Sequence, residues 1–145
     1  MSTTEYPLKI IFDTSIYIPF INKGLEYPVV SERHARPVLY MSAVVLEELY
    51  AGAYDNRTKK LLDKLYKTFT KVGRFVVPEG SDWQKTGKII AKLGEKYGFE
   101  TRYLSKLQND ILISLSARRI GAFIVTQNVK DFLRLKEFVN FKVLG

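Results

Sequence analysis

The chain has 145 residues, 46% of them hydrophobic, and carries 23 Lys and Arg against 15 Asp and Glu, for a net charge of +8. This length and composition predict one globular domain over residues 1–145, in which we expect residues 1–7 to be flexible. The lack of cysteine excludes disulfide scaffolds, thiolate zinc sites and cysteine nucleophiles. The basic charge favours an anionic partner such as nucleic acid, and the absence of a long apolar run predicts a cytoplasmic protein with no membrane span.

Five short runs rich in Val, Ile and Phe lack strict polar alternation, which is typical of strands covered on both faces. They are residues 8–12, 38–41, 74–77, 122–126 and, more weakly, 141–144. Helical patterns span residues 42–54, 58–72, 81–97 and 109–120, with Ser42 and Ser81 as N-caps and Gly121 as a helix end. We expect a helix and a loop over residues 19–37, with the single His34 in the loop. This alternation predicts an α/β fold with a mainly parallel sheet.

Asp13 directly follows the first apolar run and therefore lies at the carboxyl end of a strand, where open α/β sheets bind ligands. Thr14 and Ser15 come next and can hydrogen-bond to its carboxylate. The alternative is that Asp13 only caps the following helix.

Glu47 and Glu48 lie within an apolar helix pattern. Glu48 shares a helix face with small or apolar residues, so it points toward packing, and we favour it over Glu47 as a site residue. The alternative is that one or both carboxylates only solvate the helix edge.

Asp110 opens the last long helix pattern, where a first-turn carboxylate is also explained by the helix dipole. Thr126, Asn128 and Asp131 follow the fourth apolar run and leave the same sheet edge as Asp13. Asn128 and Asp131 have an alternative reading as the N-cap and first-turn acid of a short helix.

Each of these acidic residues can be explained by local structure alone, but their combined positions point to one shared site. Asp13 and Thr126 leave strand ends on one edge of the sheet, and we expect Glu48 and Asp110 near helix starts at that edge. Crowded carboxylates repel one another, and a divalent cation relieves this repulsion. Carboxylate ligands favour Mg²⁺ or Mn²⁺ and suit phosphoryl-transfer chemistry.

These residues resemble the motifs of the PIN-domain nucleases, most closely the VapC toxins of toxin–antitoxin pairs. The matching segments occur in family order along nearly the whole chain: 11–15, 42–52, 110–117 and 125–132. The resemblance implies a PIN-like three-layer α/β/α sandwich with a five-stranded, mainly parallel sheet.

The resemblance also implies Mg²⁺- or Mn²⁺-dependent endonucleolytic cleavage of RNA. Its metal-binding acids map onto Asp13, Glu48 and Asp110, with Thr14, Ser15 and Thr126 as supporting residues. At the fourth family position, often Asp, this chain has Asn128, so Asp131 is a second candidate for that role. Implied partners are a VapB-type antitoxin and a second copy of the chain. We expect the antitoxin groove between residues 16–21 and residues 50–66.

Two lysine stripes with helical spacing are candidates for binding RNA phosphates. They are Lys60, Lys64, Lys67 and Lys71, and Lys85, Lys88, Lys92 and Lys96. We slightly favour the alternative for most of them, which is a solvated helix face. The aromatic residues Tyr50, Tyr54, Tyr66, Trp83 and Tyr103 could stack on bases, although we favour packing in the core or between copies for most of them.

Three other functions stay open. They are an RNA-processing PIN nuclease without an antitoxin, a non-catalytic nucleic-acid-binding domain, and a phosphoacceptor domain that uses Asp13.

Overall fold

The computed structural model describes residues 8–23, 37–98 and 101–145. Its elements in chain order are β1 (Lys9–Phe12), α1 (Thr14–Lys23), β2 (Val38–Ser42), α2 (Ala43–Ala51), α3 (Asn56–Lys71), β3 (Phe75–Val76), α4 (Gly80–Tyr97), α5 (Thr101–Ile120), β4 (Phe123–Val125), α6 (Val129–Leu133), a 3-10 helix η1 (Arg134–Glu137) and β5 (Lys142–Leu144). The predictions that residues 1–7 are flexible and that His34 lies in a loop concern residues outside this description.

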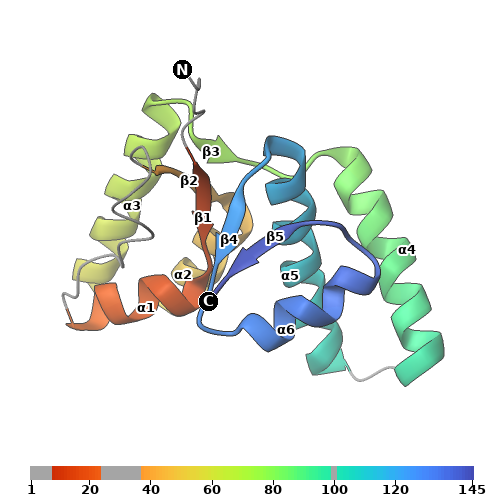
Figure 1. Cartoon of the computed structure of the whole chain (residues 1–145). Coiled ribbons are helices and arrows are strands. Elements are labelled where there is room, and N and C mark those ends of the chain that lie inside the picture. Colours follow the sequence, from red (N-terminus) through yellow and green to blue (C-terminus); the bar gives the residue numbers. More distant parts are fainter. Residues whose placement is uncertain (1–7, 24–36, 99–100) are drawn as a thin grey trace, which may run out of the picture.

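The five strands form one parallel sheet in the order β3-β2-β1-β4-β5 (Figure 1). The two central strands, β1 and β4, pair from Ile10 with Phe123 to Phe12 with Val125. Their carboxyl ends therefore lie side by side. The predicted parallel α/β sheet is confirmed, and so are the positions of all five strands, with ends that differ by at most one residue.

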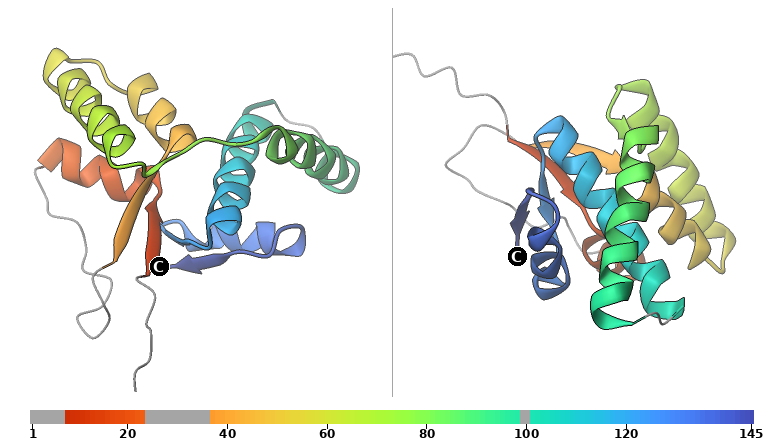
Figure 2. Two further views of the ribbon diagram at one scale, coloured as in Figure 1. Left: turned by 90° about the horizontal axis from the view of Figure 1, so that it is seen from above. Right: turned by 90° about the vertical axis from the view of Figure 1, so that its right-hand side faces the viewer.

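Helices flank the sheet at both ends. The α2 and α3 pair lies toward β2 and β3, and the α4 and α5 pair lies toward β4 and β5 (Figures 1 and 2). The core between them is formed by the apolar strand residues together with one face of α2 and of α5, including the fully buried Ile11, Val45, Ile111 and Ile124. Within the described residues, no helix is both long and apolar enough to cross a membrane.

The start of α2 agrees with its predicted N-cap, because Ser42 Oγ accepts hydrogen bonds from the backbone N–H groups of Val44 and Val45 at 3.2 and 3.4 Å. The prediction that Ser81 caps α4 was wrong. The cap is Glu79, whose backbone N–H donates to Asp82 Oδ2 at 2.9 Å.

The predicted start of α5 was also wrong. The helix begins at Thr101 rather than at residue 109, so Asp110 lies in its middle and not in its first turn. The dipole of the helix start therefore does not account for this carboxylate. The predicted helix end is confirmed, because Gly121 has a φ of 71°, a conformation that favours glycine.

Candidate active site

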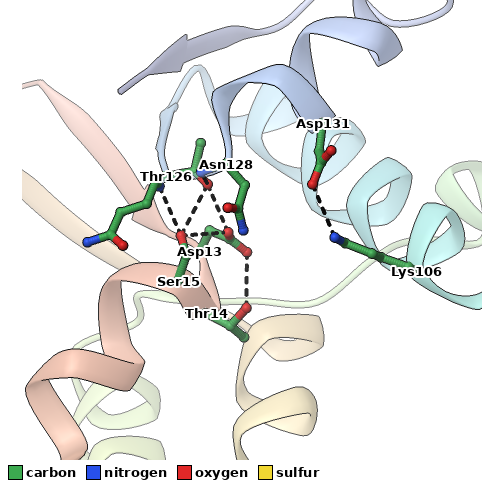
Figure 3. A network of polar contacts seen from close by, with 8 residues as sticks. Asp13, Thr14, Ser15, Lys106, Thr126, Asn128 and Asp131 are labelled. Carbon is green, nitrogen blue, oxygen red and sulfur yellow. Dashed lines mark hydrogen bonds and ion pairs between the residues drawn. The ribbon is translucent and has the colours of Figure 1, made fainter.

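Asp13 lies directly after β1 and is 4% exposed. Its Oδ2 accepts hydrogen bonds from Ser15 Oγ at 3.0 Å and from Thr126 Oγ1 at 2.9 Å, and its Oδ1 accepts from Thr14 Oγ1 at 3.3 Å (Figure 3). The three predicted supporting residues therefore all contact this carboxylate. Thr126 reaches it from the end of β4 because β1 and β4 are neighbours in the sheet.

Backbone groups fix the direction of these hydroxyl groups. The N–H of Gln127 donates to Ser15 Oγ and that of Asn128 donates to Thr126 Oγ1, both at 2.9 Å. Each hydroxyl has one proton, so it accepts from the backbone and donates to Asp13 Oδ2. The second oxygen, Oδ1, receives only the long hydrogen bond from Thr14, which leaves it with lone pairs available to a ligand.

Glu48 lies on α2 with its side chain half-buried, whereas Glu47 is exposed, as the helix-face argument predicted. Burial raises the pKa of Glu48 to about 6; a hydrogen bond from Asn109 opposes this shift, and the charge of Asp13 adds to it. Its Oε1 is buried and has no hydrogen-bond partner among the described residues. A buried carboxylate oxygen without a partner is costly, so this atom is suited to a cationic ligand.

Asp110 lies in the middle of α5 and is 7% exposed. Burial, together with the negative charges of Asp13 and Glu48, raises its pKa to about 7, and the positive charge of Lys106 opposes this shift. Asp13, Glu48 and Asp110 therefore lie close enough to influence one another, although they come from three separate elements.

The fourth region contains Asn128 and Asp131. Asn128 is exposed and precedes α6, and Asp131 lies in the first turn of that helix. In Figure 3 the Asn128 side chain lies on the Asp13 side of the turn, whereas Asp131 pairs with Lys106 Nζ at 3.1 Å. Asp131 thus forms an ion pair with Lys106. Its negative charge raises the pKa of Asp110, but less than burial, Asp13 or Glu48 does.

Two site residues were missed by sequence reasoning. Lys106 lies one helical turn before Asp110 on α5, and its charge lowers the pKa of both Asp110 and Glu48. Asn109 hydrogen-bonds to Glu48. Lys106 is four residues before Asp110 in the sequence, and Asn109 is adjacent to Asp110, so both spacings could have pointed to these residues. Lys106 was missed because α5 was expected to begin at residue 109.

The donor set fits a hard divalent cation in its chemistry. Asp13, Glu48 and Asp110 supply only oxygen atoms and excess negative charge, as Mg²⁺ and Mn²⁺ prefer. In the described parts of the chain, no three His, Asp or Glu side chains are gathered tightly enough to hold one ion as they stand. The carboxylates repel one another, so bringing them closer requires a cation between them.

A cavity of about 410 Å³ opens beside Glu48, between α1, α2 and the start of α3. Apolar side chains such as Ile18, Ile21 and Leu49 form its walls, and its charged lining residues are Glu48 and Asp55. It lies where the sequence predicted a groove, between residues 16–21 and residues 50–66.

All eight lysines of the two stripes are exposed, four on α3 and four on α4. Lys96 pairs with Glu137 at 3.0 Å. Among the aromatic candidates, Tyr54, Tyr66 and Trp83 are exposed and so lie outside the core, which leaves packing between copies as the prediction for them. The side chain of Tyr103 lies outside the description.

No family model and no curated protein matches the sequence. Among solved structures, VapBC-1 from nontypeable Haemophilus influenzae matches with a TM-score of 0.61 at 20% identity, over 94% of this chain and 97% of that chain. DNA-bound VapBC from Salmonella typhimurium matches with a TM-score of 0.61 at 22% identity, over 94% and 97%.

VapBC-5 from Mycobacterium tuberculosis, a member of the VapBC family of toxin–antitoxin systems, matches with a TM-score of 0.53 at 17% identity, over 95% of this chain and 98% of that chain. These matches establish the fold. The PIN-like α/β architecture predicted from the sequence is therefore confirmed by structures that align with nearly the whole chain.

Proposed function

We propose that this chain is a metal-dependent endoribonuclease of the VapC type and the toxin of a VapBC-type pair. The observation that carries the proposal is that Asp13, Glu48 and Asp110, from three separate elements, lie close enough for their charges to influence one another, with burial and this repulsion raising the pKa of Glu48 and Asp110. These are the residues that the PIN motifs assign to metal binding. The fold shared with VapBC structures supports the same assignment.

Asp13, Glu48 and Asp110 are the proposed ligands of Mg²⁺ or Mn²⁺. Such an ion, when bound, polarises a phosphate oxygen and lowers the pKa of a water molecule that attacks phosphorus. Asn128 is our favoured further ligand, because Asp131 is held by Lys106. A neutral amide adds no charge, so the site retains less negative charge than one with four carboxylates.

The chain's own residues prepare this site. Ser15 and Thr126 hold one oxygen of Asp13, so the other oxygen keeps a defined direction. Asn109 restrains Glu48, and Lys106 supplies a positive charge beside the acids. Lys106 also lies where it can meet a substrate phosphate after leaving Asp131, because its side chain is largely exposed.

The groove beside Glu48 is the proposed binding site of the antitoxin. Its apolar walls suit the apolar face of a peptide, and its two charged lining residues, Glu48 and Asp55, are both negative. We therefore expect the bound segment to present a basic side chain toward Glu48. RNA binding by the lysine stripes, a cytoplasmic location and a homodimer are further parts of the proposal that follow from the charge and the resemblance.

The test is cleavage of RNA by the purified chain with Mn²⁺ or Mg²⁺. We expect cleavage that EDTA stops and that Asp13→Asn abolishes without loss of folding, while Glu95→Gln, which changes an exposed carboxylate on α4, keeps full activity. RNA binding with no cleavage at any metal concentration would instead support a non-catalytic nucleic-acid-binding domain. Equal cleavage by Asp13→Asn would remove the proposed metal site from the reaction.

A further inference from the structure

A second groove lies on the other side of α2 from the first. It has a volume of about 440 Å³ and is bounded by α2, α4, α5 and the segment that joins β3 to α4. Figures 1 and 2 show this segment running from the α2 and α3 side of the molecule across to α4. The volume lies in the range of small-molecule sites, roughly 300–1,000 Å³.

The groove contains Trp83, the single tryptophan of the chain, which is 51% exposed. An exposed tryptophan offers a wide flat face that binds other planar groups. Val77 and Pro78 line the groove next to it and add apolar surface. This wall is therefore an exposed aromatic surface with apolar neighbours.

The position of Trp83 is fixed by a polar network beneath it. Arg119 of α5 donates to the carbonyl oxygen of Val77 at 2.9 Å and pairs with Asp82 at 3.2 Å and Glu79 at 3.5 Å. Asp82 is buried and directly precedes Trp83. The backbone N–H of Trp83 donates to the backbone carbonyl oxygen of Glu79 at 3.2 Å. The backbone that carries Trp83 is thus fixed before any ligand arrives, which lowers the entropy cost of binding.

Polar residues of two other elements also line the groove. Gln108 and Asn109 lie on α5 and Glu47 lies on α2. An amide offers both donors and acceptors, and a carboxylate accepts hydrogen bonds from N–H groups. None of the described residues that line the groove is positively charged, and Glu47 repels anions. The groove therefore suits a flat, neutral group with N–H and carbonyl edges and does not suit a phosphate.

The groove also adjoins the proposed catalytic acids. Asn109 lines it and hydrogen-bonds to Glu48, and it directly precedes Asp110. Glu47 likewise precedes Glu48 in the chain. Asn109 is therefore a direct contact between a group in the groove and Glu48.

We propose that the groove binds one nucleobase of single-stranded RNA, stacked on Trp83 with its edge toward Gln108 and Glu47, next to the phosphate that is cleaved. A base is the flat, uncharged part of a nucleotide, and protein sites for unpaired RNA combine aromatic stacking with hydrogen bonds to base edges. This proposal rests on the proposed ribonuclease function, because it assigns a substrate subsite to the same acids.

The first test uses tryptophan fluorescence of the whole chain in EDTA, with ribonucleosides as uncharged probes. Because Trp83 is the single tryptophan, its fluorescence reports on this groove alone. We expect saturable quenching by nucleosides, none by ribose, and weaker quenching in Gln108→Ala. Free tryptophan amide at the same absorbance corrects for light absorbed by the nucleosides.

The second test measures cleavage of short RNAs that lack one base beside the cleaved bond. We expect Trp83→Ala to lower kcat/KM on intact RNA by about 5- to 150-fold, the range for one stacked base, and Trp83→Phe to keep most of it. Removal of the base should cost the wild-type chain a similar factor and cost Trp83→Ala little. Leu133→Ala, which removes a side chain of similar exposure from α6, should cleave as the wild-type chain does.

The outcomes separate this proposal from the proposed function. Metal-dependent cleavage without nucleoside quenching, or with equal loss on base removal in wild-type and Trp83→Ala, would overturn the base site and leave the ribonuclease intact. A change from dimer to monomer in Trp83→Ala without quenching would make the groove an interface between copies. Quenching without cleavage would support the base site and contradict the ribonuclease.

Discussion

The ionised side chain of Asp110 is expected to lower the free energy of unfolding of the metal-free chain, because it is buried and lies near two other carboxylates. Its pKa lies near 7 in the folded chain, against an ordinary value of 3.8. One pKa unit corresponds to about 1.36 kcal/mol, so the ionised carboxylate destabilises the metal-free fold by about 4 kcal/mol. Because the folded pKa is the higher one, this group's stabilising contribution is fully present below about pH 4 and is lost as the pH rises to about 7.

Asp110→Asn removes the charge and keeps the shape of the side chain. In urea unfolding without metal, we expect the variant to be more stable than the wild-type chain by about 2 to 4 kcal/mol near pH 8, because burying the amide still has a cost. Near pH 4 the two should agree within about 0.5 kcal/mol, since the wild-type carboxyl is then protonated. Added Mn²⁺ should stabilise the wild-type chain and leave the variant nearly unchanged.

Glu95→Gln is the matched control, because it neutralises an exposed carboxylate on α4. It should differ from the wild-type chain by less than about 0.5 kcal/mol at either pH. If Asp110→Asn were no more stable than the wild-type chain near pH 8, neither burial nor the repulsion among the acids would disfavour the ionised carboxylate, contrary to its raised pKa.

Three further changes address the surroundings of the acids. Thr126→Val deletes a hydroxyl hydrogen bond to Asp13 and leaves the Asn128 N–H without its acceptor; the free energy of unfolding should fall by about 1–3 kcal/mol in urea, while Thr126→Ser stays near the wild-type value. Lys106→Met removes the charge that lowers the pKa of Asp110, so the acidic limb of the cleavage–pH profile should move to higher pH; an unmoved limb would show that this lysine does not act on the acids. Asn128→Asp adds a carboxylate, and calorimetry should find Mn²⁺ binding about tenfold tighter, whereas unchanged binding would place residue 128 outside the site.

The sequence predicted the sheet and the Asp13 cluster well, because both depend on simple rules. Apolar runs without alternation indicate buried parallel strands, and the carboxyl ends of parallel strands lie at one edge. Ser15 and Thr126 are 111 residues apart, yet each follows a strand and both reach Asp13. The choice of Glu48 over Glu47 followed from helix facing alone.

The surroundings of Asp110 could not be predicted in the same way. Residues 101–108 are mostly polar, so they gave no apolar periodicity and the first two turns of α5 were missed. Lys106 was lost with them. Its ion pair with Asp131 joins two elements through tertiary packing, which no local pattern encodes. The contacts of Arg119 that link α5 to the start of α4, next to Trp83, are likewise tertiary.

Whether Asp13, Glu48 and Asp110 hold a divalent cation can be seen in crystals grown with Mn²⁺ and measured at the manganese absorption edge. We expect an anomalous peak among the three carboxylates, with oxygen ligands from each of them, and no such peak in Asp13→Asn. An empty site at a Mn²⁺ concentration that supports cleavage, or an ion bound elsewhere, would contradict this expectation.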